Sequence, residues 1–155
     1  MRERDLAEQY ETVGLDSDAL AAARLMAEQR LPALLVLDEA GAPKAILPAS
    51  QMIKIVVPGY VIEDPTLAAV IDEHHADRLC SVLKGRTVRD CLSKTTPPPA
   101  IAAGDDTALE VAALMAQARS PLVAVMNTGA AGAAQLLGVI TASHLLERLL
   151  AAGAA

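Results

Sequence analysis

Two short segments of this 155-residue chain carry hydroxyl, amide and imidazole side chains just before stretches with helical periodicity. The first is Pro48–Gln51 and the second is Thr141–His144. A hydroxyl beside a helix start, where backbone N–H groups have no intrahelical partner, suits a phosphate group. Thr141 supplies such a hydroxyl, whereas Pro48 has neither a hydroxyl nor an N–H group. If an anion binds, we therefore expect it at the second segment.

A second polar cluster combines Asp72, Glu73, His74 and His75, followed by Asp77 and Cys80. On a helix, Asp72 and His75 would share a face, but two adjacent histidines cannot easily face one ion. The spacing is not that of a His-Glu-x-x-His zinc site. We therefore predict a solvated helix face here and no metal site.

Motifs for catalysis are not found in the sequence. There is no Gly-x-Ser-x-Gly elbow for a serine nucleophile, no Walker loop and no Gly-x-Gly-x-x-Gly fingerprint. Cys80 and Cys91 do not form a Cys-x-x-Cys pair, so they are interpreted as buried, reduced thiols. The chain is not predicted to be an enzyme.

Composition narrows the class of protein further. Hydrophobic residues make up 53% of the chain, which is too apolar for a disordered protein, and aromatic residues only 1%. A net charge of −6 and so few aromatic rings argue against nucleic-acid binding. The apolar run Leu31–Leu37 is too short to cross a bilayer, and Met1–Asp5 does not lead into a signal peptide. We expect a cytoplasmic protein without membrane insertion.

The chain also repeats itself. The segment Asp18–Asp38 aligns with Thr107–Asn127 at an offset of 89 residues, and nine of the 21 aligned positions are identical. A second block, Ala45–Met52, aligns with Gly138–Leu145 at an offset of 93. The difference, 93 − 89 = 4 residues, places a longer loop, Thr128–Ala134, in the second copy. Two copies of one supersecondary unit are therefore expected.

Each copy has the pattern helix, strand, turn, strand, helix. In the first copy we expect a helix capped by Asp16 or Ser17, and a strand at Ala33–Asp38 buried on both faces. The following elements are a strand at Lys44–Leu47 and a helix at Ala49–Val57. The second copy is expected to contain an N-cap at Asp106, a helix to Ala118, strands at Leu122–Met126 and Leu136–Ile140, and a helix at Ala142–Ala151.

The connector between the copies is expected to be helical. A turn at Pro58-Gly59 precedes Asp64-Pro65, which is typical of a helix start, and the helix would run to about Leu83 before Gly85. A further helical turn is expected at Thr87–Leu92. The prolines Pro97–Pro99 then lead in extended conformation into a strand around Ala100–Ala103.

The ordered pair of units resembles a CBS-domain pair, also called a Bateman module. The resemblance is carried by the two repeats over residues 12–57 and 87–150, and the second copy is the better preserved. Its matching segments are Asp106–Leu109, Ala112–Met115, Arg119, Pro121–Val125, Gly138–Leu145 and, as the lead-in, Thr87–Leu92. The resemblance implies a mixed α/β (α+β) fold with two β-α-β-β-α repeats packed sheet to sheet about a pseudo-twofold axis. We divide the chain into a first repeat with its lead-in (1–57), a connector (58–86) and a second repeat (87–155).

Members of this family commonly bind adenosine-containing ligands in two clefts between the repeats. The resemblance therefore implies AMP, ADP, ATP or S-adenosylmethionine as regulatory ligands. Carried over by position, the ligand-binding residues would be Ser50, Gln51, Ile101, Ala103, Pro121, Leu122, Thr141, Ala142, Ser143 and His144. The family motif places an aspartate where this chain has Gln51 and His144, and a threonine where it has Pro48. A neutral acceptor binds ribose hydroxyls more weakly than a carboxylate does.

The family resemblance also implies the role of the chain. Such modules usually dimerise and regulate a separate or attached enzyme, channel or transporter. We predict a homodimer, because Leu25 with Met26, Leu114 with Met115, and Leu146 with Leu150 would otherwise leave apolar helix faces exposed. The partner would be a separate enzyme or transporter. The alternative is an interaction scaffold whose clefts do not bind a ligand.

Overall fold

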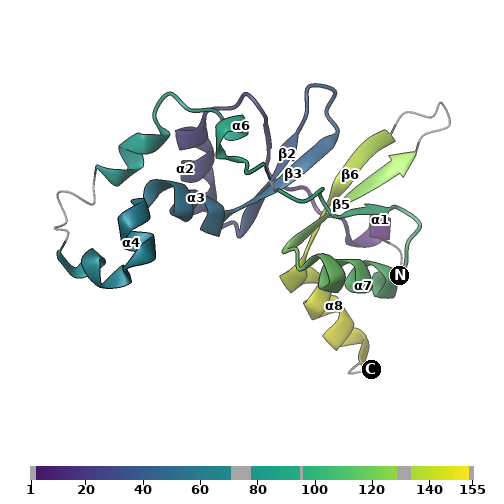
Figure 1. The fold of residues 1–155 in the computed structure, drawn as a ribbon. Helices are drawn as coiled ribbons and strands as arrows, with labels where there is room; N and C mark the ends of the chain where they lie inside the picture. Colours follow the sequence, from purple (N-terminus) through teal and green to yellow (C-terminus); the bar gives the residue numbers. More distant parts are fainter. Residues whose placement is uncertain (1–2, 71–77, 95, 129–133, 154–155) are drawn as a thin grey trace.

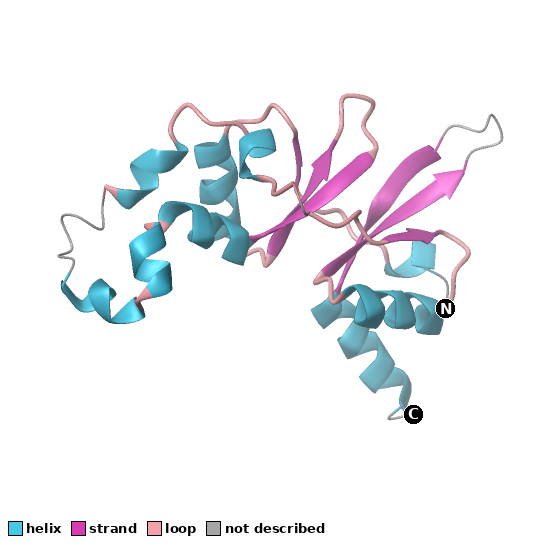
Figure 2. Cartoon of the chain, in the orientation of Figure 1, coloured by secondary structure: helices cyan, strands magenta, loops and turns pink. Residues whose placement is uncertain are grey.

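The protein contains two three-stranded sheets, each covered by helices on its outer face (Figures 1 and 2). This computed structural model describes residues 3–70, 78–94, 96–128 and 134–153. In the first sheet, β1 (Thr12–Gly14) pairs in parallel with β2 (Ala33–Leu37), which pairs antiparallel with β3 (Pro43–Pro48). The second sheet repeats this order with β4 (Ile101–Ala103), β5 (Leu122–Thr128) and β6 (Ala134–Thr141).

The long helices occupy equivalent places in the two halves. Each first strand is followed by a helix, α2 (Ala19–Gln29) or α7 (Ala108–Ala118). Each hairpin is followed by a second helix, α3 (Ala49–Val56) or α8 (Ala142–Gly153). The predicted fold class, a mixed α/β protein with two β-α-β-β-α repeats, is confirmed.

The core is divided into three clusters by the two sheets. Along β2, Leu34 and Val36 face the helices of the first repeat, whereas Ala33 and Leu35 face the other sheet. The central cluster joins the two sheets through Ala33, Leu35, Leu122, Ala124 and Val139, each at most 1% exposed. Successive strand residues point to opposite faces, so a strand buried on both faces needs a continuous apolar run. The prediction of doubly buried strands is therefore correct.

The helices α2 and α7 begin one or two residues later than predicted. The side chain of Asp18, rather than Asp16 or Ser17, caps α2 by accepting from the Ala21 N–H at 2.9 Å. Thr107, rather than Asp106, caps α7. Ser17 and Asp106 instead accept from the N–H groups of Gly14 (2.9 Å) and Ala103 (3.0 Å), respectively. The predicted caps thus close the turn between strand and helix, which leaves the next residue to cap.

The same two helices end on arginine in the left-handed conformation. Arg30 has φ 54° and Arg119 has φ 50°, and they are equivalent positions of the repeat. In each case the next N–H group bonds back into the last turn, Leu31 to Met26 at 2.9 Å and Ser120 to Met115 at 3.3 Å. This geometry usually selects glycine, because a Cβ atom crowds the backbone there. The helices therefore end before the prolines Pro32 and Pro121.

The predicted long helix of the connector is wrong in its described parts. A short helix, α4 (Gly59–Glu63), lies where a turn was expected, and two 3-10 segments follow, η1 (Pro65–Val70) and η2 (Leu79–Leu83). Neither α4 nor η1 contains a buried residue, so neither has the packed apolar face from which helices gain most of their stability. The predicted turn near Thr87 is confirmed as α6 (Val88–Cys91). The acidic and histidine cluster at 72–77 lies outside the described residues.

The lead-in of each repeat packs against the other repeat. A short helix, α1 (Glu3–Leu6), contacts β6, and Leu6 is buried in the core of the second repeat. Conversely, Val88 and Cys91 of α6 are buried in the core of the first. Sequence periodicity did not predict α1 or β1, because both are too short to show a period.

Candidate ligand clefts

One cleft lies where β3 and α3 of the first repeat meet the turn between α7 and β5 of the second. Its volume is about 370 Å³. The lining includes Pro48, Gln51 and Lys54 from the first repeat and Arg119, Ser120 and Pro121 from the second. The segment Thr96–Pro99 forms a further wall. We call this the first cleft.

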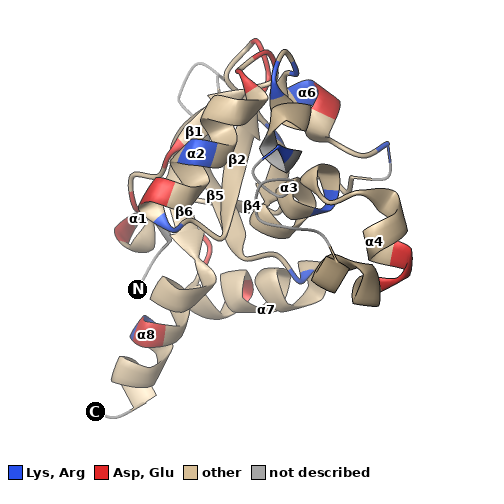
Figure 3. Ribbon diagram, turned by 90° about the vertical axis from the view of Figure 1, so that its left-hand side faces the viewer, with Lys and Arg blue, Asp and Glu red and all other residues tan. Residues whose placement is uncertain are grey.

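The charged side chains that line the first cleft are both basic. Lys54 belongs to α3, and Arg119 follows the last residue of α7. Figure 3 shows basic residues on the ribbon of α3 and at the end of α7. No aspartate or glutamate is among the described lining residues. Gln51 adds an amide that can both donate and accept. The prolines add apolar surface, so the cleft combines apolar walls with a few polar groups, as small-molecule sites do.

A proline-rich wall separates the first cleft from a second hollow. The segment Pro97–Pro99 lines both the first cleft and a hollow of about 600 Å³ on its other side, toward Ala45 and Arg89. Proline has no backbone N–H group, so it cannot donate a hydrogen bond to a neighbouring strand. This wall therefore stands beside β3 with space on either side.

The equivalent junction of the second repeat holds the predicted segment Thr141–His144. The Thr141 hydroxyl accepts a hydrogen bond from the His144 N–H at 3.2 Å and lies 3.4 Å from the Ser143 hydroxyl. It thus caps the start of α8. The imidazole Nδ1 of His144 lies 3.4 Å from a carboxylate oxygen of Glu8. The predicted ligand segment Thr141–His144 therefore lies beside a carboxylate from the N-terminal segment.

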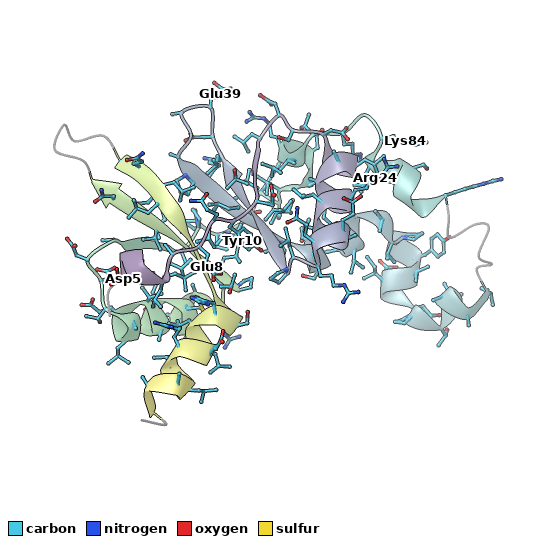
Figure 4. All side chains as sticks on the ribbon, turned by 180° about the vertical axis from the view of Figure 1, so that it is seen from behind. Asp5, Glu8, Tyr10, Arg24, Glu39 and Lys84 are labelled. Carbon is cyan, nitrogen blue, oxygen red and sulfur yellow. The ribbon has the colours of Figure 1, made fainter. Side chains whose placement is uncertain are left out.

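That N-terminal segment follows β6 and then crosses to the first sheet. Glu8 and Val139 exchange two backbone hydrogen bonds, both of 2.9 Å. The Tyr10 hydroxyl donates to the Ala33 carbonyl at 2.7 Å. Burial raises the pKa of Tyr10, which keeps the phenol protonated as a donor. Figure 4 shows Glu8 and Tyr10 along this path between the two sheets.

A hollow of about 350 Å³ lies beside the crossing segment. It is lined by Gln9, Tyr10, Glu11, Gln29 and Leu31. Gln29 and Leu31 are equivalent by the repeat to Ala118 and Ser120, which line the first cleft. The hollow therefore belongs to the second cleft, but Thr141 and His144 are not among its lining residues.

The predicted site residues are thus distributed over several places. Gln51 and Pro121 line the first cleft together, whereas Ser50 is exposed on α3 outside its lining. Ile101 and Ala103 are exposed on β4. The side chain of Leu122 is fully buried between the sheets, where only its backbone is available to a ligand. These assignments remain predictions.

Sequence reasoning missed Lys54, Arg119 and Glu8. One signal was available for Arg119, because it is identical to Arg30 in the repeat alignment although both are exposed. Lys54 gave no signal, since a single lysine on an amphipathic helix is ordinary. Glu8 lies outside the aligned repeats, and only the fold brings it to His144.

The described residues offer neither a metal-binding cluster nor a membrane span. No group of three or more histidine, cysteine or acidic side chains is close enough to hold an ion in that part of the chain. None of the helices described is long and apolar enough to cross a bilayer. Cys91 is a free, buried thiol whose pKa is raised by burial.

Comparisons with known proteins agree with this architecture. The family model of the CBS domain matches residues 88–151. A crystal structure of a CBS domain-containing protein of unknown function from Kribbella flavida DSM 17836 is 48% identical, covers 97% of this chain and 99% of its own, and superposes with a TM-score of 0.83. Comparison with the curated proteins returns no significant match. The chain belongs to the CBS-domain family, as a CBS-domain pair.

Two more distant structures share the fold. CBSX2 in complex with AMP is 16% identical with a TM-score of 0.65, over 97% of this chain and 96% of that chain. The CBS domain of a bacterial CNNM/CorC family Mg²⁺ transporter, in complex with ATP, is 15% identical with a TM-score of 0.65, over 97% and 87%. At these identities the similarity establishes the fold alone.

Proposed function

We propose that this protein is a regulatory CBS-domain pair that binds an adenosine nucleotide in the first cleft. In this role it modulates a separate enzyme or transporter in the cytoplasm and has no catalytic activity of its own. The observation that carries the proposal is the first cleft itself, with Lys54 and Arg119 on opposite repeats and no carboxylate in its described lining. The AMP and ATP complexes of the two distant relatives support the choice of ligand class.

The lining of the first cleft favours a phosphate-bearing ligand. Ammonium and guanidinium groups form strong, charge-assisted hydrogen bonds with phosphate oxygens. They repel the sulfonium of S-adenosylmethionine. The amide oxygen of Gln51 replaces the acid of the family motif as an acceptor for ribose hydroxyls. We therefore expect AMP, ADP or ATP to bind more tightly than S-adenosylmethionine.

Titration calorimetry with these four compounds tests the proposal. Lys54→Ala should weaken nucleotide binding by about tenfold, the lower end for a hydrogen bond to a charged group, because Lys54 is exposed. Glu147 occupies the equivalent position on α8, so Glu147→Ala is the matched control and should leave affinity unchanged. Equal affinities in all three proteins would refute the cleft assignment.

The absence of acids at Gln51 and His144 supports a second candidate function. A CBS pair whose clefts bind no ligand would act as an interaction scaffold. In that case none of the four compounds would bind the wild-type protein, while contact with the partner would persist.

We also propose that the protein is a homodimer, and one of the three apolar faces expected from the sequence supports this. Met26 and Met115 are buried, and Leu25 and Leu114 are partly buried against the cores, so these pairs do not form exposed faces. The third predicted pair, Leu146 and Leu150 on α8, is exposed at 57% and 65%, and Leu109 on α7 is 75% exposed. A second copy packed on this face would remove them from water. Light scattering should report twice the chain mass of 16.1 kDa, and a monomer at micromolar concentration would contradict this.

A further inference from the structure

We propose that residues 7–11 are a built-in occupant of the second cleft, so that the protein binds one nucleotide per chain and exposes the Thr141 site only when this segment is released. We call residues 7–11 the N-terminal strap. The inference rests on the proposed function for the identity of the ligand. The geometry of the strap stands independently of it.

Backbone pairing holds the strap against β6. The two hydrogen bonds between Glu8 and Val139 make a short antiparallel pairing two residues before Thr141. The close approach requires Gly138, because a Cβ atom there would lie 2.6 Å from the Glu8 carbonyl oxygen. Real side chains do not tolerate such a distance, so any other residue at 138 must displace the strap.

The first cleft lacks both of these features. By the offsets of the repeat, Pro97 is equivalent to Glu8, Ala45 to Gly138 and Ile46 to Val139. Pro97 cannot donate the hydrogen bond that the Glu8 N–H gives, and the Ala45 methyl fills the space that Gly138 leaves. Pro97 and Ile46 accordingly both line the first cleft. Two sequence differences thus explain why the strap pairs with β6, whereas Pro97 cannot make the same pairing with β3.

Side chains on either side of Glu8 anchor the strap. Leu6, just before it, is 1% exposed within the core of the second repeat. Tyr10 packs on the central cluster and bonds to Ala33. Between these anchors, Glu8 and Gln9 are exposed. The centre of the strap can therefore leave β6 while Leu6 and Tyr10 remain in place.

The charge of the strap opposes the predicted ligand. Glu8 faces His144, the residue that replaces the ribose-binding acid of the family motif. Glu11 lines the neighbouring hollow, and Glu147, the counterpart of Lys54, follows on α8. A phosphate at His144 would meet the Glu8 carboxylate, whereas in the first cleft it meets Lys54 and Arg119. Beside His144 the strap therefore opposes the ligand by the charge of Glu8 as well as by its volume.

Hydrogen exchange and calorimetry together test the inference. In the wild-type chain, the Glu8 and Val139 amides should exchange at least about 100-fold more slowly than in an unfolded peptide. Titration with AMP or ATP should give one site per chain. Gly138→Ala and Glu8→Pro should each remove the protection of Val139 and raise the stoichiometry to two. Ala45→Gly, the matched change in the first repeat, should leave protection and stoichiometry unchanged because Pro97 still lacks an N–H group.

The outcomes separate this inference from the proposed function. Two sites in the wild-type protein, or an unprotected Glu8 amide, would overturn the inference while leaving nucleotide binding intact. One site that persists after Glu8→Pro has released the strap would overturn it as well. If the wild-type protein binds no nucleotide, the proposed function fails, and the exchange of Val139 in the two variants still decides whether the strap covers β6.

Discussion

Replacing Arg119 by glycine should change stability and ligand affinity in opposite directions. Arg119 has φ 50° at the end of α7, a conformation that costs an L-residue about 1–2 kcal/mol. Glycine removes this cost, but its greater conformational freedom stabilises the unfolded chain by about 0.5–1 kcal/mol. The net effect is a stabilisation of about 0.5–1 kcal/mol. For a chain of this length, Tm should rise by about 1–4 °C.

The same substitution removes a guanidinium from the first cleft. A hydrogen bond to a charged group contributes about 1.5–3 kcal/mol, and exposure of Arg119 favours the lower end. We therefore expect nucleotide affinity to fall by about tenfold. Arg30 has the same backbone conformation, φ 54°, at the end of α2. Arg30→Gly should therefore raise Tm by a similar amount without weakening binding.

Thermal unfolding and titration calorimetry on both variants measure these effects. A lower Tm for Arg119→Gly would refute the argument from backbone strain. Unchanged affinity in Arg119→Gly, or an equal loss in Arg30→Gly, would refute the assignment of Arg119 to the ligand site. The pair is informative because backbone geometry is matched and only the surroundings of the two side chains differ.

Two further predictions concern stability. The Thr87 backbone N–H donates to the Asp90 carboxylate at 3.0 Å and lowers the pKa of Asp90, so this hydrogen bond stabilises the folded protein above the unfolded-state pKa of about 3.9 and loses its effect as pH falls through the folded pKa. Urea unfolding from pH 7 to pH 2.5 should show that Asp90→Asn removes this part of the acid sensitivity, and a pH profile identical to that of the wild type would contradict it. Leu122→Ala opens a cavity between the sheets and should lower the free energy of unfolding by about 2–5 kcal/mol, whereas the control Glu39→Ala in the exposed β2–β3 turn should change it by less than about 0.5 kcal/mol. A loss below about 1 kcal/mol for Leu122→Ala would contradict the description of the central cluster.

Much of the fold could be predicted from the sequence, because its signals are local. The run at Ala33–Leu37 and its copy at Leu122–Val125 are apolar at every position, which indicates strands buried on both faces. Helical periodicity located α2, α3, α7 and α8 to within a few residues. The repeat offsets predicted four extra residues in the second copy but placed them in a longer loop, Thr128–Ala134. Thr128 and Ala134 instead pair with each other at the ends of the longer strands β5 and β6, and residues 129–133 lie outside the described residues. The CBS-domain pair was indicated by the resemblance of the repeated segments to that family.

The connector and the helix caps were predicted less well. Which residue caps a helix depends on the turn that precedes it. At both sites the side chain of the predicted cap, Ser17 or Asp106, accepts a hydrogen bond from a backbone N–H group of that turn instead. The segment Pro65–Leu83 has the composition of a helix, but its described parts form the 3-10 segments η1 and η2, and η1 has no buried residue. Local propensity does not include these tertiary terms.

The difference between the two clefts was decided by tertiary structure. The sequence favours the Thr141 end for an anion, since the hydroxyl and the helix start lie side by side. The fold brings Glu8 to His144 and Val139 there, and Lys54 to the same cleft as Arg119 at the other end. Charge and access at a site depend on every segment that reaches it in space. Composition and spacing describe only the segment to which a residue belongs.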